Sequence, residues 1–276
     1  MTAIKIQKTF LYLFIGLITV ACLIPFLMML INSSRSATEI LSGFTLVPGN
    51  QFFINLRSFR DDVNIWQGMR NSFIIAVSVI TLTAYFSALT AYGFEFYDFP
   101  GKKILFGFVV MMMMVPAQLG LIGMYDLNYK LGTLDTYVPL ILPAIASSGA
   151  MFFIRQYMAS TIHRALIEAA RIDGCSELAI FHKIVFPLAV PAIATMSIMG
   201  FIGSWNSYIA PLMLIISTEK KTLPVLVAAL RGTRVATINQ GAMYAAIAVS
   251  VLPMVIIFML FSNFIITGIS AGSVKG

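Results

Sequence analysis

Long runs of uncharged, apolar residues are the feature that most limits what this chain can fold into. The first run, residues 9–31, contains no Asp, Glu, Lys or Arg, and about 20 apolar residues are enough for one helical crossing of a bilayer. The sequence therefore predicts an all-α, polytopic membrane protein with six transmembrane helices in a single transmembrane domain, residues 1–276. The five further runs are 71–94, 103–124, 137–157, 188–215 and 242–267.

The composition supports the membrane class and argues against a nucleic-acid partner. Only 11% of the residues are charged and the mean hydropathy is +0.91, whereas about 25% of the residues of a soluble domain are charged. The net charge of +7 comes from Lys and Arg scattered between the apolar runs, a pattern that fits topology and lipid headgroups. Cys22 and Cys175 show neither metal nor redox spacing.

The topology follows from the number of crossings, but the orientation does not follow from charge. Lys5 and Lys8 precede the first run as they would in a secretory signal, yet the run is too long for one and lacks an A-x-A site, so we expect it to remain as a helix. Six crossings place both termini on one side, with 95–102 and 158–187, and place 32–70, 125–136 and 217–241 opposite. Lys and Arg number 9 on each side, and only the first helix favours an inside N-terminus.

No catalytic or cofactor site is predicted in this chain. A membrane enzyme needs carboxylates, a His ligand set or a Ser and base pair at membrane depth, but both His163 and His182 lie in the 158–187 loop. Arg155 is the main ionisable residue of the predicted helices, so we expect no counter-ion pair, which disfavours a channel or proton-driven carrier. The Gly101-Lys-Lys triplet is no P-loop, because Phe96 occupies the position of the required upstream Gly.

The 158–187 loop reads as two short helices joined by a tight turn. Asp173 and Gly174 are predicted to end the first helix, since Gly tolerates the positive φ of a sharp exit. Ser176 is predicted to cap the second helix and Pro187 to end it. The apolar residues of the first helix, residues 162–172, recur at helical spacing: Ile162, Leu166, Ala169 and Ala170.

The same loop carries a specific motif. Glu168-Ala169-Ala170 is followed after three residues by Gly174, then by Ile184 and Phe186-Pro187. This pattern resembles the EAA loop of ABC importer permeases, which ends I-x-L-P, so Phe186 stands where Leu is usual. A lipid-facing interfacial helix is the alternative, with cations at the headgroups; these are Arg164, Arg171 and Lys183.

The resemblance extends to carbohydrate permeases. Trp205-Asn206 with Pro211 is similar to their W-N-x-x-x-x-P stretch, and Leu223-Pro224-Val225 with the ending 268–276 looks like the maltose-type second permease. The resemblance implies a type I permease in the bacterial plasma membrane with cytoplasmic termini. It also implies three partners: a homologous second permease, a cytoplasmic ATPase dimer that binds ATP and Mg, and an extracellular or periplasmic solute-binding protein. The C-terminal tail of this chain is expected to contact the ATPase dimer.

Two groups of site residues follow from the resemblance. The sugar path is expected at Trp205, Asn206 and Tyr208, which offer aromatic faces and a neutral amide. An interfacial aromatic belt remains an equal alternative for Trp205 and Tyr208, and a non-sugar solute remains an alternative cargo. The residues expected to couple to the ATPase are Glu168, Ala169, Ala170, Asp173, Gly174 and Ser176.

Overall fold

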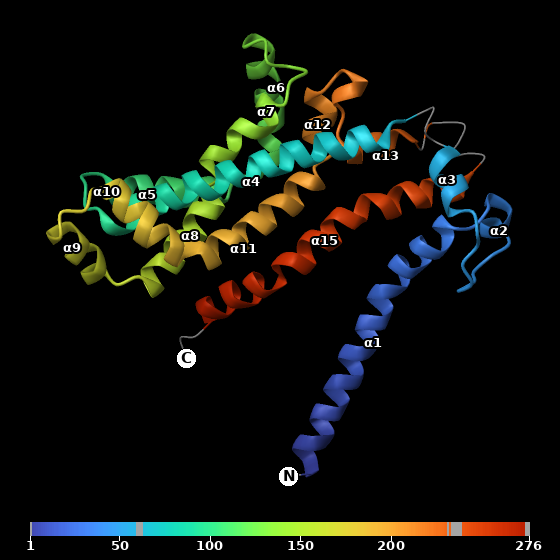
Figure 1. Ribbon diagram of the computed structural model, residues 1–276, viewed down its shortest axis with the longest axis horizontal. Coiled ribbons are helices and arrows are strands. Elements are labelled where there is room, and N and C mark those ends of the chain that lie inside the picture. Colours follow the sequence, from blue (N-terminus) through green and yellow to red (C-terminus); the bar gives the residue numbers. More distant parts are fainter. Residues whose placement is uncertain (1, 59–62, 231, 233–238, 274–276) are drawn as a thin grey trace. The chain divides into compact units, whose positions relative to one another are not determined.

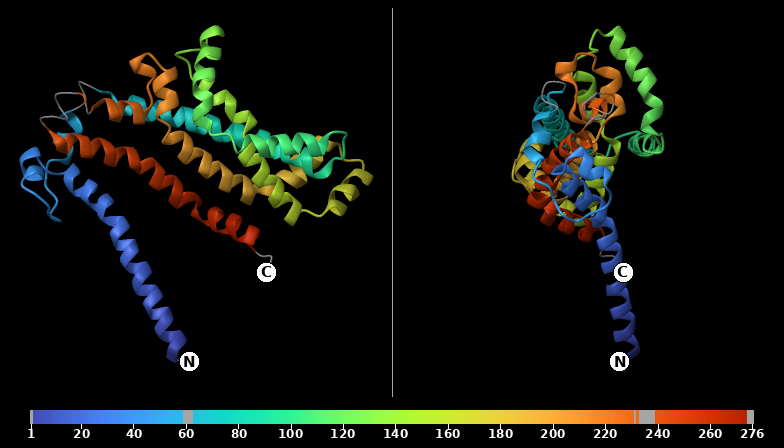
Figure 2. Two further views of the ribbon diagram at one scale, coloured as in Figure 1. Left: turned by 180° about the vertical axis from the view of Figure 1, so that it is seen from behind. Right: turned by 90° about the vertical axis from the view of Figure 1, so that its right-hand side faces the viewer.

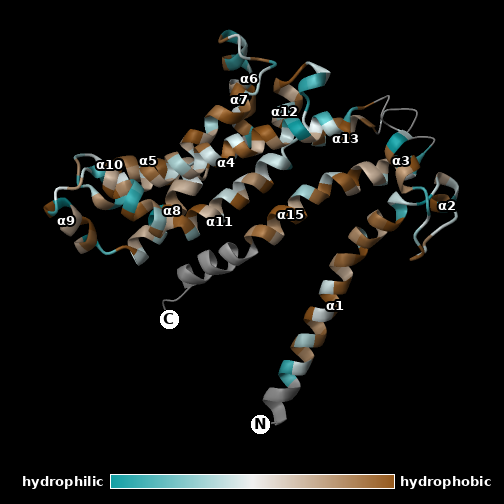
Figure 3. Cartoon of the chain, viewed as in Figure 1, coloured by the Kyte–Doolittle hydropathy of each residue, from teal (hydrophilic) through white to brown (hydrophobic). Residues whose placement is uncertain are grey.

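The computed structural model describes the whole chain except residues 1, 59–62, 231, 233–238 and 274–276 (Figure 1). The side chains of residues 2–6, 117 and 262–273 also lie outside the described part. Every regular element in the described part is a helix, and apolar residues dominate most of them (Figure 3). The residues form two compact units. Unit 1 contains Met1–Trp66 and Leu226–Leu252, and unit 2 contains Gln67–Val225 and Pro253–Gly276.

Unit 1 is organised around one buried amide. Asn55 donates to the carbonyls of Ser33 and Arg35, both at 2.9 Å, and accepts from Asn239 at 3.0 Å. A side chain at Gly241 would place its Cβ 2.3 Å from the Arg35 carbonyl, so only Gly permits this approach. These contacts of Asn55 and Gly241 join the end of the first helix to the start of the last. The helices of this unit are α1 (Thr2–Ser33), α2 (Ala37–Leu41), α3 (Phe52–Ser58), most of α13 (Leu223–Leu230) and the first part of α15 (Gln240–Ser273).

Unit 2 is a bundle in which α4, α8 and α11 lie side by side (Figures 1 and 2). Its helices, in chain order, are α4 (Ile65–Phe96), α5 (Lys102–Met112), η1 (Ala117–Gly120), α6 (Leu121–Lys130), α7 (Val138–Ile141), η2 (Leu142–Ala146), α8 (Ser148–Thr161), α9 (Arg164–Ile172), α10 (Glu177–Ile180), the π-helical turn η3 (Phe181–Val185), α11 (Phe186–Trp205), α12 (Ile209–Leu214), η4 (Thr218–Lys220), the start of α13 (Leu223–Leu230) and the part of α15 from Pro253 onward.

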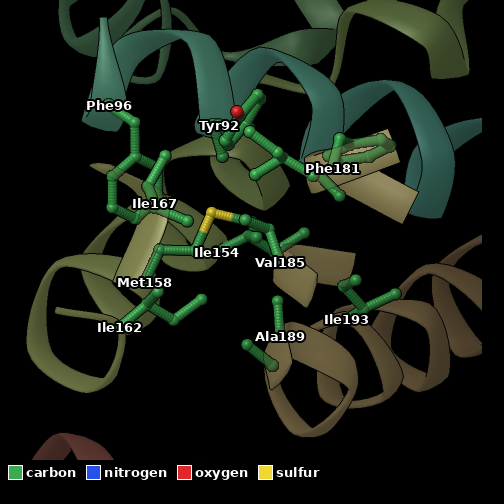
Figure 4. Close-up of a cluster of buried hydrophobic side chains, with 14 of the residues drawn as sticks. Tyr92, Phe96, Ile154, Met158, Ile162, Ile167, Phe181, Val185, Ala189 and Ile193 are labelled. Atoms are coloured by element: carbon green, nitrogen blue, oxygen red, sulfur yellow. The ribbon is translucent and has the colours of Figure 1, made fainter. Parts of the chain in front are cut away.

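The core of unit 2 lies where α9 and α10 meet the ends of α4, α8 and α11 (Figure 4). Ile154, Ile167, Phe181 and Val185 are fully buried there. Tyr92 packs its ring against Phe181, with the centroids 5.6 Å apart. The 158–187 loop is therefore packed onto the bundle rather than detached from it.

Five helices in the described residues are long and apolar enough to cross a bilayer: Gln7–Ser33, Ile65–Phe96, Val138–Thr161, Glu177–Trp205 and Gln240–Phe261. The predicted all-α membrane fold is confirmed. The predicted run 103–124 is not one helix, because α5 ends at Met112 and the chain turns before η1 and α6. Pro116 explains the break, since it lacks an amide donor and disfavours helical geometry at Val115.

Two further boundaries differ from the prediction. The run 188–215 is interrupted after Trp205, before α12 begins. Pro187 does not end the second loop helix: α10 continues through η3 into α11. In η3 the Phe186 amide bonds to the Phe181 carbonyl five residues back. This widened turn leaves room for the Pro187 ring, which would clash with a carbonyl in a regular α-helix.

The expectation that the helices hold no counter-ion pair was wrong. Helix α4 continues through Glu95, beyond the apolar run, and Glu95 lies 3.0 Å from Arg155 of α8. Both side chains are largely buried, and the Arg155 guanidinium lies 4.3 Å above the Phe106 ring. The pair ties α4 to α8 near the end of the bundle that carries α9.

Candidate functional site

The apolar face that anchors helix α9 differs in part from the one predicted. Ile167 and Ala170 are buried in the chain, whereas Leu166 and Ala169 are exposed. Residues three apart on a helix share a face, so Ile167 and Ala170 point together into the core of unit 2. Ile162, just before the helix, is buried as predicted.

The turn after α9 has the predicted geometry. Gly174 adopts φ +79°, and its amide donates to the Arg171 carbonyl at 3.0 Å. The Cys175 amide donates to the Ala170 carbonyl, also at 3.0 Å. These two bonds form a Schellman motif, which closes the helix end and reverses the chain. Ser176 then caps α10 by accepting from the Ala179 amide at 3.4 Å.

Glu177, which the sequence analysis did not single out, joins both arms of the loop to α4. Its carboxylate accepts from the Arg171 guanidinium at 2.7 and 3.3 Å and from the Tyr92 hydroxyl at 2.6 Å. The guanidinium also lies 5.2 Å from the Tyr97 ring. The pKa of Tyr97 is raised mainly by burial and secondly by the nearby Glu177 carboxylate. The hydrogen bonds to Glu177 raise the pKa of Arg171.

A second set of ionic contacts attaches α9 to the segment after α4. Arg164 donates to the Glu95 carbonyl at 2.8 Å and lies 3.3 Å from the Asp98 carboxylate. Lys102 pairs with the same carboxylate at 3.2 Å. The hydrogen bonds from Lys102 and then Arg164 hold the pKa of Asp98 below its usual range.

These contacts surround a polar cavity of about 310 Å³ between α9 and the end of α4. Glu168 lines this cavity and is exposed, and among the described residues it has no ion pair or hydrogen bond. Ala169, Asp173, Gly174 and Ser176 are also exposed. Ala170 is only 7% exposed, because its own chain covers it, so it supports the loop from inside rather than offering a surface.

The three residues expected on the sugar path do not share a surface. Trp205 is 2% exposed and stacks on Phe201, with ring centroids 5.5 Å apart. Asn206 is exposed, and its side-chain amide donates to the Ile202 carbonyl at 2.9 Å. Tyr208 is exposed beyond the end of α11. Trp205 is therefore a packing residue in this chain.

A cavity of about 520 Å³ lies elsewhere in unit 2, where η2 ends and α8 begins. Its walls combine the apolar side chains of α5 with the hydroxyl residues Ser87, Ser147 and Ser148. Ser87 is almost fully buried, and its hydroxyl has no hydrogen-bond partner in the described part of the chain. The α8 N-terminus has no side-chain cap, so the cavity offers hydrogen-bonding groups without formal charge.

Comparison with known proteins identifies the family. The family model described as binding-protein-dependent transport system inner membrane component matches residues 84–270. The arabinooligosaccharides transport system permease protein AraQ of Halalkalibacterium halodurans is 35% identical over 256 residues, which are 91% of each chain. The diacetylchitobiose uptake system permease protein NgcG of Streptomyces coelicolor is 31% identical, over 93% of this chain and 85% of its own.

A solved structure has the same fold. It is a bacterial ABC transporter involved in the import of the acidic polysaccharide alginate, and it superposes with a TM-score of 0.81 at 22% identity, over 94% of this chain and 96% of the other. The matched proteins are transport components rather than enzymes. The chain belongs to the family of binding-protein-dependent transport system inner membrane components, the permeases of ABC importers.

Proposed function

We propose that this chain is one of two permease subunits of a sugar or oligosaccharide importer and that α9, the Gly174 turn and α10 couple it to a separate ATPase. The observation that carries the proposal is the exposure of Glu168 on a loop whose own shape is fixed by the Schellman turn and the Glu177 contacts. A rigid element that exposes carboxylates with no ion pair among the described residues, here Glu168 and Asp173, suits docking to a basic partner surface.

The contacts of the loop favour a protein partner over a lipid surface. The lipid alternative needs cations free to reach headgroups. Arg164 and Arg171, however, are each paired with a carboxylate of the same chain. Lys183 is the exposed cation that remains of the three.

A sugar is the cargo supported by the relatives, which include permeases named for arabino-oligosaccharides and diacetylchitobiose. The cavity at the α8 N-terminus supports a path for such a neutral solute, because Ser87, Ser147 and Ser148 offer hydroxyls without charge. In several transporter folds the ends of discontinuous helices form part of the substrate site. We therefore move the proposed path in this subunit from Trp205 to this cavity.

The remaining parts of the machine are proposed from the family. The second permease would complete the translocation pathway, and an extracellular or periplasmic solute-binding protein would deliver the sugar to loops 32–70 and 217–241, of which 59–62, 231 and 233–238 lie outside the described residues. The ATPase pair would bind ATP and Mg and meet the α9–α10 loop. This assignment places both termini in the cytoplasm of a bacterial cell.

Glu168→Ala tests the coupling role directly. Loss of a charge-assisted contact at the ATPase surface should weaken docking by about 1.5 to 3 kcal/mol. The assay is ATPase recovery on pull-down, followed by ATP-driven uptake of arabino-oligosaccharide into proteoliposomes that contain the assembled transporter.

Asp126→Ala is the matched control, because it removes an exposed carboxylate of α6 that pairs with Lys130 instead. We expect the control to retain both the ATPase and uptake. If Glu168→Ala behaves like Asp126→Ala in both measurements, the loop does not dock through Glu168 and the coupling assignment fails.

A further inference from the structure

We propose that Tyr92 and Glu177 form a latch that makes α4 move with the coupling loop, so that Tyr92 is a positioning residue for force transmission. The proposal rests on the proposed function of the loop. The latch is the 2.6 Å hydrogen bond from the Tyr92 hydroxyl to the Glu177 carboxylate. It joins two residues that lie 85 positions apart in the chain.

The latch matters because α4 has no direct covalent connection to the loop. The chain connects α9 to α8 on one side and α10 to α11 on the other. Any motion that reaches α4 from the loop must therefore pass through side-chain contacts. Those contacts include the latch, the attachment of Arg164 to Glu95 and Asp98, the Tyr85 hydroxyl 3.3 Å from the His182 ring, and the packing of the Tyr85 and Tyr92 rings on Phe181.

The surroundings of the latch make it stiffer than the attachment through Arg164. Tyr92 is 3% exposed, and its ring is held between Phe181 and Tyr97, with centroids 5.6 Å from each. Arg171 holds the other oxygen of the Glu177 carboxylate at 2.7 Å. By contrast, the Arg164 and Asp98 side chains are exposed, and exposed ion pairs contribute little.

The position of the π-helical turn explains why a latch is needed. Helix α10 is four residues long and is followed at once by η3, Phe181–Val185. Hydrogen-bond geometry in such a turn is irregular, and π turns recur at functional sites. The bond to Tyr92 fixes the start of α10 just before this turn, so that displacement of the loop is passed to α4 instead of being absorbed as bending.

Helix α4 is also a wall of the proposed solute path. Ser87, which lines the 520 Å³ cavity, lies on α4 five positions before Tyr92. One helix therefore connects the latch to the cavity. Movement of the loop would reach the cavity wall through α4 as well as through α8.

Tyr92→Phe is the test, because it removes the hydroxyl and keeps the ring and its packing. Tyr157→Phe is the matched control: Tyr157 packs against the same core, and no hydrogen bond of its hydroxyl is found among the described residues. Both variants are prepared in the assembled transporter. The measurements are ATPase recovery, sugar transported per ATP hydrolysed, and amide hydrogen exchange across Arg164–Ile180.

We expect Tyr92→Phe to retain the ATPase, to exchange the α9–α10 amides about tenfold faster, as loss of one bond to a charged group implies, and to transport several-fold less sugar per ATP. Tyr157→Phe should match the parent in all three. Faster exchange with a parental transport ratio, unchanged exchange, or loss of the ATPase would each overturn the latch. A parental transporter that moves no sugar would instead refute the proposed function, which keeps the two failures distinct.

Discussion

Gly174→Val is expected to misdirect the coupling loop without affecting membrane insertion. Gly174 has φ +79°, and no heavy atom outside its neighbouring residues lies within 4 Å of a Cβ built there. The cost of the substitution therefore comes from the backbone and not from a clash. For an L-residue the left-handed conformation costs about 1–2 kcal/mol, and a branched side chain such as Val is among the worst occupants.

The structure shows what this cost would break. Leaving the left-handed conformation would disrupt the bonds from Gly174 to Arg171 and from Cys175 to Ala170, both 3.0 Å. The same movement would separate Arg171 from Glu177, which face each other across the turn at 2.7 Å. A penalty of about 1–2 kcal/mol shifts the equilibrium between the loop with these bonds intact and the loop with them broken by a factor of roughly 5–30. A shift of this size is large enough to be measured as faster hydrogen exchange in α9 and α10.

Two comparison variants make the prediction sharp. Gly174→Asn should recover most of the parental exchange and transport, because Asn enters the left-handed region far more readily than Val. Gly123→Val should resemble the parent, since Gly123 has neither a positive φ nor a neighbour within 4 Å of its Cβ. Equal transport and exchange for Gly174→Val and Gly123→Val would show that the turn conformation does not control the loop.

Three other outcomes are expected. Trp205→Ala should lower the free energy of unfolding of the detergent-purified protein by about 3–5 kcal/mol, the cost of such a change in a soluble core, whereas Asn206→Ala should not. Equal melting temperatures for the two variants would contradict the packing role of Trp205. Ser148→Leu should narrow the 520 Å³ cavity and replace one of its hydroxyls, so uptake should fall while assembly with the ATPase is retained, and parental uptake would remove the cavity from the path. In a cysteine-free background, a membrane-impermeant thiol reagent should label Ser58→Cys but not Ser176→Cys in intact cells, and the reverse pattern would invert the topology.

Sequence reasoning succeeded where structure depends on neighbours along the chain. The turn at Gly174 and the cap at Ser176 follow from backbone and side-chain preferences of single residues. The membrane class follows from length and hydropathy alone. The break near Pro116 was harder, because a proline inside an apolar run produces either a kink or an end, and packing decides between them.

The missed features depend on contacts between distant segments. Glu177 and Arg171 lie six positions apart across a predicted turn, so their pairing could have been anticipated. Nothing in the sequence indicated that Tyr92 would meet Glu177, because that contact depends on how α4 packs against α10. Trp205 shows the same limit: its type and position near the end of a helix suit an interface or a sugar face equally, and only tertiary packing buries it.

The shortness of α5 has a consequence for biogenesis. Eleven residues, Lys102–Met112, extend about 16 Å, roughly half of the hydrocarbon thickness. A helix of this length followed by a broken turn is a poor substrate for independent release from the translocon into lipid. Its Phe106 stacks on Phe152 of α8, with centroids 6.0 Å apart, and α8 is synthesised later. The packing that holds α5 in the bundle therefore becomes available only after α8 has left the ribosome.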